Sequence, residues 1–311
     1  MISIVVEWEN VLLTTAGRGA SMLRQLGDEL GGARRALGED FEVLVVYADD
    51  SCQRTEIADQ LGPEGTSVRF VPAPGSGYYE LKNIGVAHAR GNVVVLVDSD
   101  VLPEPGWLVE LLQPFADPNV QAVAGHSFVE PTSLWAKAFA LAWFFPLRAD
   151  AADRIDVSES FFANNVAFRR ETARAFPFPP VPGAARGACR VLAGQLRAHH
   201  VSLVVNPAAL VSHPPPAGVR RAVARALVQG RDEALLAAAY PAETNARPFS
   251  PEAVRAVGAR LREVVARRQL VGLSGRALPA ALAIVLGYYA LMAAGAAFAR
   301  IAPARAKQLA L

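Results

Sequence analysis

Residues 92–100, Asn-Val-Val-Val-Leu-Val-Asp-Ser-Asp, decide the fold. The run from 93 to 97 is aliphatic throughout, which predicts a strand buried on both sides of a largely parallel sheet. Ligands of open α/β sheets bind beyond the carboxyl ends of the strands, so Asp98 and Asp100 are expected in that crevice. Residues two apart in an extended chain face the same way, and two carboxylates can hold one Mg2+ or Mn2+. The alternative is a turn whose aspartates only cap backbone amides.

The residues on both sides of this stretch form an ordered series of motifs. Lys82-Asn83-Ile84-Gly85 and Ala89-Arg90-Gly91 precede it, and Pro103 and Trp107 follow it. This arrangement resembles that of family 2 glycosyltransferases of the GT-A fold over residues 1–215, with Lys82 where the family usually has Arg. The resemblance implies an α/β domain with a Rossmann-like, mostly parallel central sheet flanked by helices. It also implies transfer of a sugar from a UDP- or GDP-sugar donor.

Hydrophobic periodicity predicts the remaining elements. Strands are expected at 2–6, 41–47, 68–71, 120–124 and 201–205, and helices at 20–37, 81–89, 107–115, 134–147, 219–240, 251–269 and 277–299. Gly17-Arg18-Gly19 does not predict a dinucleotide site, because Met22 stands where the third glycine is needed.

Composition excludes several classes of protein. The chain has 311 residues, 52% hydrophobic and 19% charged, which is more apolar than an average soluble domain. A formal net charge of +2 gives no case for nucleic-acid binding. Cys52 and Cys189 form neither a disulfide framework nor a zinc spacing, which favours a reduced, cytosolic catalytic domain. Because a strand is predicted from residue 2, no signal peptide is expected.

The resemblance implies which residues bind the nucleotide. The acidic residues after the second strand, Asp49 or Asp50, would hydrogen-bond the base of the donor, with a solvated turn as the alternative. The first loop reads Glu7-Trp8-Glu9-Asn10 and lacks the proline of the family's Pro-x-Tyr-Asn-Glu. Glu9 is the nucleotide-binding candidate in that loop.

The phosphates and the metal are expected at the centre of the same edge. Lys82 and Asn83 can offer charge and helix N-terminal amides to phosphate, or serve only in solvation and capping. Asp98 and Asp100 would hold the cation that carries the diphosphate. His213 follows the last strand, and its imidazole can complete the ligand set, particularly for Mn2+. A structural histidine in a proline-rich loop is the alternative.

A second block, Phe161 to Arg170, is similar to the family's Gly-x-Asn-x-Ala-x-Arg-Arg block, which lines the acceptor side of the cleft. Asn165 takes the asparagine position, and Arg169 the first arginine position. The alternative is a hairpin-like strand whose asparagines turn the chain.

The catalytic base is unknown. The family's Glu-Asp pair, whose Asp is the usual base, falls on Ala188 and Cys189. A thiol with a lowered pKa can accept a proton, although a buried and inert cysteine is the alternative. The acceptor can instead be an anion that needs no base, such as a lipid phosphate, or the chain can only bind. Another carboxylate can also serve, and the candidates are Asp153, Asp156, Glu159, Asp232 and Glu233.

The rest of the chain is expected to be helical and membrane-associated. Residues 216–270 form a basic helical linker, whose arginines either face anionic lipid or are merely solvated. In the hydrophobic segment 271–311, residues 277–299 carry no charge and are long enough to span a bilayer, with a hairpin or interfacial helix as the alternative. The excess of arginine before this stretch places the catalytic domain on the cytoplasmic side of the inner membrane. The aromatic segment 134–147 suits either a membrane surface or a core.

These inferences predict a metal-dependent glycosyltransferase with a lipid-linked or saccharide acceptor. The alternative is a catalytically degenerate, membrane-attached partner protein that binds sugar nucleotides. A nucleotidyltransferase, which can also place carboxylates at a strand end, is a third possibility.

Overall fold

The computed structural model describes residues 1–15, 17–49, 54–61, 66–151, 154–181, 183–242 and 250–306, and it divides into two compact units. Unit 1 comprises Met1–Ser127, Ala151–Pro179 and Leu192–His213. Unit 2 comprises Phe128–Asp150, Pro180–Val191 and Pro214–Leu311. The boundary at His213 falls close to the change of character expected at residue 215. The two earlier segments of unit 2 lie within the range that the sequence assigned to the first domain.

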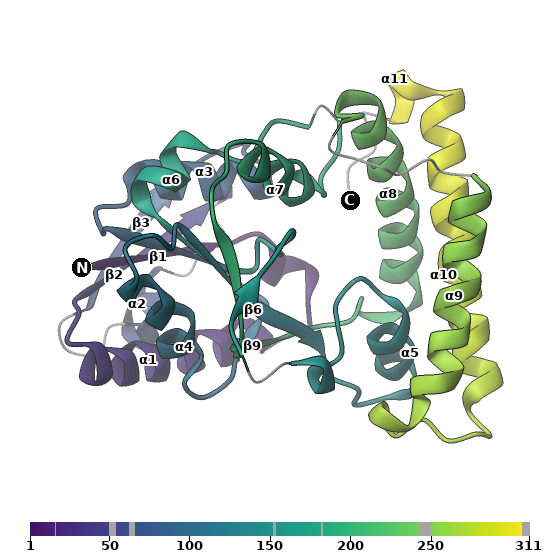
Figure 1. Ribbon diagram of the computed structural model, residues 1–311, viewed down its shortest axis with the longest axis horizontal. Coiled ribbons are helices and arrows are strands. Elements are labelled where there is room, and N and C mark those ends of the chain that lie inside the picture. The colour runs from purple at the N-terminus through teal and green to yellow at the C-terminus, as the bar shows by residue number, and fades with distance from the viewer. Residues whose placement is uncertain are drawn as a thin grey trace. The chain divides into compact units, whose positions relative to one another are not determined.

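Unit 1 is built on a mixed sheet, with strand order β3-β2-β1-β4-β8-β6-β9-β5 and with β7 paired to β9 (Figure 1). The strands are β1 Ile2–Glu7, β2 Phe41–Tyr47, β3 Thr66–Pro72, β4 Val93–Asp98, β5 Leu102–Pro103, β6 Ala122–Val129, β7 Asp156–Val157, β8 Asn165–Arg169 and β9 Leu203–His213. Strands β3, β2, β1 and β4 are parallel, as expected around residues 93–97. Strand β8 runs antiparallel to β4 and β6, and β9 runs antiparallel to β5 and β7, which makes the sheet as a whole mixed.

The carboxyl ends of the parallel strands meet in register. Every residue of β4 is buried, as its aliphatic sequence predicts. Glu7 of β1 pairs with Asp98 of β4 on one side and with Val46 of β2 on the other. The loops after these strands therefore start side by side at one edge of the sheet.

Helices cover both faces of the sheet in unit 1. They are α1 Arg18–Leu37, α2 Arg54–Leu61, α3 Tyr78–His88, α4 Trp107–Leu112, α6 Arg170–Ala175 and the later part of α7 Ala188–Ala198. Helices α3 and α6 lie on one face, and α1, α2 and α4 lie on the other (Figure 1). Helix α3 packs closely on β1, because a Cβ on Gly85 would lie 2.2 Å from Val5.

Two element boundaries differ from the predicted ones for a physical reason. Strand β9 continues past the predicted end at 205 to His213, and it contains Pro207; a proline is tolerated in a strand where its missing N–H is not needed. The helix expected at 134–147 is α5 Leu134–Ala142, so the prediction is wrong for residues 143–147. Pro146 disfavours helical backbone at the residue before it. The elements α2, α6, β5 and β7 were not expected, and all are too short to show a periodic pattern.

Unit 2 is helical. Besides α5 it contains α8 Gly218–Ala239, α9 Pro251–Arg267, α10 Leu278–Ile301 and α11 Pro303–Ala306. Backbones of α8 and α10 touch, because a Cβ on Gly230 would lie 1.8 Å from the carbonyl oxygen of Met292. A Cβ on Gly295 would likewise lie 2.0 Å from the carbonyl oxygen of Leu227. Within the described ranges, α10 is the one helix long and apolar enough to cross a membrane, judged by length and composition.

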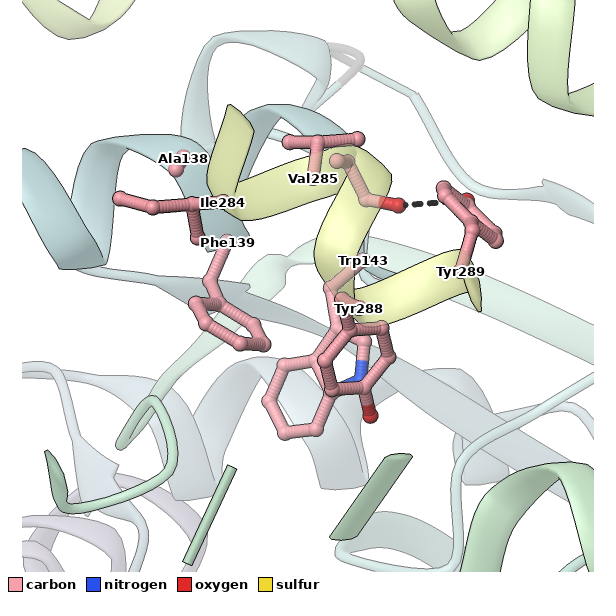
Figure 2. A pocket seen from close by; sticks show the side chains of 8 residues that line it. Ala138, Phe139, Trp143, Ile284, Val285, Tyr288 and Tyr289 are labelled. Atoms are coloured by element: carbon pink, nitrogen blue, oxygen red, sulfur yellow. Dashed lines mark hydrogen bonds between the residues drawn. The ribbon is translucent and has the colours of Figure 1, made fainter. Parts of the chain in front are cut away.

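The aromatic residues at the end of α5 pack inside unit 2. Figure 2 shows Phe139 and Trp143 beside Tyr288 of α10, and the ring centroids of Phe139 and Tyr288 are 5.1 Å apart. Trp143 and Phe145 are buried, whereas Phe144 is 38% exposed. Burial therefore favours the core interpretation of this aromatic segment for Trp143 and Phe145.

Candidate active site

Three potential metal ligands come together in unit 1. Asp98 ends β4, Asp100 lies two residues on, and His213 ends β9. Strand β5 pairs with the last part of β9, which brings the loop after β4 to His213. One ligand atom from each residue lies within 4.8 Å of the other two. Ligands on opposite sides of Mg2+ are about 4.2 Å apart, so this oxygen and imidazole set fits a divalent ion after a small contraction.

Three side chains form hydrogen bonds with the carboxylate of Asp98. Its Oδ1 accepts from the Lys82 ammonium at 2.7 Å, and its Oδ2 accepts from the Asn10 amide at 2.9 Å. The Tyr78 hydroxyl lies 2.8 and 2.9 Å from the two oxygens. Lys82 is fully buried and lies 4.9 Å from the centroid of the Tyr78 ring. In this structure Lys82 therefore balances the charge of Asp98.

Glu7 is a buried acid at this edge that the sequence analysis missed. Its carboxylate accepts from the backbone N–H groups of Glu9, Asn10 and Ser99, so it ties the loop after β1 to the loop after β4. Burial raises the pKa of Glu7 well above its usual value, and the charge of Asp98 raises it further. The signal in the sequence was an acid at the end of an apolar strand, in the position of the family's proline.

Arg18 is a second residue that the sequence analysis did not select. Its guanidinium donates to the backbone carbonyl of Asp100 and, at 2.8 Å, to the backbone carbonyl of Ser212. It therefore links the segments that carry Asp100 and His213. The segment Gly17-Arg18-Gly19 can be compared only with a dinucleotide motif, which it does not match, so no pattern in the sequence pointed to this role.

Some of the nucleotide-binding candidates lie at the same edge of the sheet. Asp49 is exposed just beyond β2, and Glu9 is half-buried beyond β1. Asp50 lies outside the described residues. The side-chain amide of Asn83 bonds to the backbone of unit 1. It donates to the carbonyl of Phe178 and accepts from the N–H of Phe178, both at 2.9 Å. This pairing accounts for Asn83 without a phosphate.

Both predicted acceptor residues have hydrogen-bond partners within unit 1. Asn165 is fully buried; it accepts from the Trp107 indole at 2.8 Å and donates to the carbonyl of Ala209 at 2.9 Å. Arg169 pairs in register with Val93, at the opposite end of β4 from Asp98, about 16 Å of extended chain away. Its guanidinium donates to the backbone carbonyls of Val120, Phe115 and Asp117.

Two of the candidate bases lie at the wrong end of a strand. Asp156 pairs with Val205, eight residues from His213 on β9, which is about 26 Å of extended chain. Glu159 follows in the same segment and forms an ion pair with Arg197. Both carboxylates therefore lie far along β9 from the metal cluster, which disfavours them as bases for a substrate bound there.

The remaining base candidates belong to unit 2 or are not described. Asp232 is buried; its Oδ1 accepts from Arg231, and its Oδ2 accepts from the N–H groups of Ala185 and Arg186. Burial raises the pKa of Asp232, and Arg231 opposes that rise. Both oxygens of Asp232 are therefore engaged in holding the segment before α7. Cys189 is half-buried in the first turn of α7. Asp153 lies outside the described residues.

Comparison with known proteins identifies the family. Residues 20–174, about half of the chain, match Glycosyl transferase family 2. A stretch of 106 residues is 35% identical to the pre-mycofactocin glycosyltransferase of Mycobacterium tuberculosis and covers 34% of this chain. The chain spans only 20% of that curated relative.

Solved structures share the fold. The mannosyltransferase PcManGT from Pyrobaculum calidifontis, in complex with GDP-Man and Mn2+, matches with a TM-score of 0.54 at 20% identity, over 98% of this chain and 81% of that one. S. aureus TarS 1–349 in complex with UDP-GlcNAc matches with a TM-score of 0.51 at 14% identity, over 96% and 91%. At such identities the likeness shows the fold alone. Together with the family match, it establishes that this chain belongs to glycosyltransferase family 2 and has the GT-A fold.

Proposed function

We propose that the protein transfers a sugar from a UDP- or GDP-sugar, with a divalent cation held by Asp98, Asp100 and His213. The observation that carries this proposal is the clustering of the three ligand atoms within 4.8 Å at the edge where the parallel strands end. PcManGT was solved with GDP-Man and Mn2+, and TarS with UDP-GlcNAc, which supports the same classes of donor and metal. When bound, Mn2+ or Mg2+ supplies charge stabilisation for the departing diphosphate.

The residues around the cluster prepare it for a charged ligand. Lys82 orients Asp98 through a buried ion pair. Arg18 holds the two segments that carry Asp100 and His213. Asp49 and Glu9 lie along the same edge, beyond β2 and β1, and we assign them to the nucleoside side of the donor.

An acceptor that is already an anion fits this site better than a neutral hydroxyl. Asp156 and Glu159 lie at the far end of β9, and both oxygens of Asp232 are engaged. A phosphate oxygen needs no base to remove a proton before it attacks the anomeric carbon. We therefore favour a lipid phosphate as the acceptor over a saccharide.

Unit 2 supplies the proposed attachment to the inner membrane, with unit 1 on the cytoplasmic side. On α10, Leu286 and Ile301 are 49% and 84% exposed, in a helix whose residues 277–299 carry no charge. Backbone contacts along α8 hold α10 in the helical unit. Because α8 carries the charged residues Arg231 and Asp232, this packing favours α10 lying at the membrane surface over a helix that spans the bilayer alone.

Calorimetry tests the donor and the metal. UDP-glucose, UDP-GlcNAc and GDP-mannose are titrated into the protein with Mn2+ or with EDTA, and each mixture is assayed for release of the nucleoside diphosphate. We expect one donor to bind in the presence of Mn2+ and not in the presence of EDTA. Asp100→Ala should lose this Mn2+-dependent binding. Asp156→Ala, which removes an exposed acid far from the cluster, is the matched control. Equal Mn2+-dependent binding by both variants would refute the metal site, and binding without turnover in the presence of lipid phosphate would favour the degenerate partner protein.

A further inference from the structure

The seam between α9 and α10 in unit 2 is hollow. A cavity of about 350 Å3 opens between Ala256 and Arg260 of α9 and Tyr289 and Ala293 of α10. Its volume lies in the range of small-molecule sites, about 300–1,000 Å3. Protein interiors are normally close-packed, so a hollow between neighbouring helices is a place where a guest can complete the packing.

A second hollow, of about 390 Å3, follows along the same pair of helices. It is lined by Leu261 and Val265 of α9 and by Leu282 and Leu286 of α10. Residues four apart on a helix share a face, so the lining of α9 continues from the first hollow into the second. From the first hollow to the second, the residue numbers of the lining rise on α9 and fall on α10. The two hollows therefore lie one after the other along this antiparallel pair of helices.

The two hollows differ in polarity. In the first, the Tyr288 hydroxyl donates to Gln229 at 2.7 Å, and the Gln229 amide donates to Glu233 at 3.4 Å. Arg260 lines the same hollow. In the second hollow, Arg262 is the single charged residue of the lining, and the rest is aliphatic. The seam therefore suits a molecule with one polar end and one hydrocarbon end.

The charge around the polar end favours an anion. Arg260 lines the hollow, and Arg225 lies over the ring of Trp143, which also lines it, at 5.6 Å from the centroid. Glu233 and Glu263 are the opposing charges. Glu263 accepts from Arg260 at 2.7 Å and from Arg267 at 2.9 Å, so two guanidinium groups share one carboxylate. Burial raises the pKa of Glu233, although Arg190 lowers it.

We propose that the α9/α10 seam binds a lipid with a single hydrocarbon chain and an anionic head, with the head at Arg260 and the chain along Leu261, Val265, Leu282 and Leu286. This proposal rests on the proposed function and deepens it, because it names a lipid as a ligand that unit 2 binds. Binding at the seam needs neither donor nor metal.

Three probes separate head from chain. Dodecyl phosphate carries both, dodecanol carries only the chain, and inorganic phosphate carries only the head. Titration calorimetry of the full chain, below the micellar concentration of the amphiphiles, should give affinity in the order dodecyl phosphate, dodecanol, inorganic phosphate. Equal affinity for dodecyl phosphate and dodecanol, or no binding of either, would overturn the proposal.

A matched pair of variants tests the location. Ala293 and Ala294 are neighbouring exposed residues of α10, and only Ala293 lines the hollow. Ala293→Phe should weaken dodecyl phosphate binding by about tenfold or more, and Ala294→Phe should leave it unchanged. If the two variants bind equally, or if anionic vesicles bind both while dodecyl phosphate binds neither, the protein only adsorbs to lipid surfaces and the seam is not a site.

A second pair tests the head group. Arg260→Gln should weaken dodecyl phosphate and leave dodecanol unchanged, with Arg255→Gln, at an exposed position of the same helix, as the control. An equal loss for both probes would mean that Arg260 only supports the helix packing. The failures are separable: normal Mn2+-dependent donor binding without seam binding refutes this inference alone, and seam binding without any donor binding refutes the proposed function alone.

Discussion

Among the described residues, each unit contains a deeply buried ion pair that involves an aspartate, and the two pairs serve different ends. In unit 1, Lys82 and Asp98 are 2.7 Å apart, with side chains 0% and 3% exposed. In unit 2, Arg231 and Asp232 are also 2.7 Å apart, with side chains 3% and 2% exposed. By distance and burial alone the two pairs are indistinguishable.

The surroundings of the two carboxylates separate them. Asp232 accepts from two backbone N–H groups in addition to Arg231, so its carboxylate holds the chain segment before α7 in place. Asp98 lies beside a second carboxylate and an imidazole, whose ligand atoms converge with its own. The comparison teaches that a buried aspartate is a candidate ligand when further donor atoms converge beside it, and a structural clamp when backbone N–H groups surround it.

The largest expected effect comes from removing each aspartate in turn. Asp98→Ala and Asp232→Ala should each lower the free energy of unfolding by about 3–5 kcal/mol, because a buried cation is left without its partner. Urea unfolding followed by circular dichroism measures the loss. Only Asp98→Ala should also abolish the stabilisation of the protein by Mn2+. If Asp232→Ala abolished it too, the contrast between clamp and ligand would be wrong.

The next effect separates binding from stability. His213→Ala should weaken Mn2+ binding by about 100-fold, or about 2.7 kcal/mol, with little change in the free energy of unfolding. Calorimetric titration of Mn2+ measures it. His199→Ala is the control, because His199 is exposed and packs on Phe176 away from the cluster. Unchanged Mn2+ affinity in His213→Ala would return His213 to the structural alternative.

A smaller effect is expected from the residue that positions the ligands. Arg18→Gln should weaken Mn2+ binding by about tenfold, because it releases the backbone carbonyls of Asp100 and Ser212. Arg24→Gln removes an exposed arginine of the same helix that bonds only locally, to Ser21, and should have no effect. Equal behaviour of the two variants would show that the Arg18 contacts do not shape the cluster.

The smallest effect concerns pH, and its sign should differ between the units. Burial favours a raised pKa for Glu42 of unit 1, but hydrogen bonds from Ser3, the Arg90 backbone and Arg69 outweigh it and lower the pKa. The contribution of Glu42 to stability is therefore present above its unfolded pKa and is lost as pH falls through its folded pKa.

Glu233 of unit 2 has its pKa raised by burial, so its contribution is present below the unfolded pKa and is lost as pH rises through the folded pKa. The free energy of unfolding of Glu42→Gln and of Glu233→Gln is measured across pH 3–7 and compared with that of the wild type. The difference from the wild type should change with pH in opposite directions for the two variants. Slopes of the same sign would contradict this assignment.

Much of unit 1 was predictable because its signals are local. The aliphatic runs at 41–47 and 93–97 became β2 and β4, and the apolar spacing within 20–37 became the buried face of α1. Short elements such as β5 and α6 escaped prediction because two to six residues carry no period. Glu7 and Arg18 escaped because each bonds a backbone group of a distant segment, Ser99 for Glu7 and Ser212 for Arg18, and no side-chain pattern records such contacts.

The motif series predicted roles from position in the block, and it could not show which contacts those residues make in the fold. Asn165 and Arg169 stand where the acceptor residues of the family would stand, yet each satisfies buried or backbone groups within unit 1. The interleaving of unit 2, which takes in residues 128–150 and 180–191, likewise follows from packing between helices far apart in the chain.

By itself the sequence determined the parallel strands, the acidic edge at Asp98 and Asp100, and the membership of a glycosyltransferase family, because these depend on runs and spacings within short windows. Only the tertiary structure decided that His213 lies beside the two aspartates, that Lys82 forms a buried ion pair with Asp98, and that Asp156 lies far along β9 from them. The physical reason is that charge, burial and ligand geometry depend on which strands pair, and the pairing of β5 with β9 brings His213 beside Asp98, more than a hundred positions away in the chain.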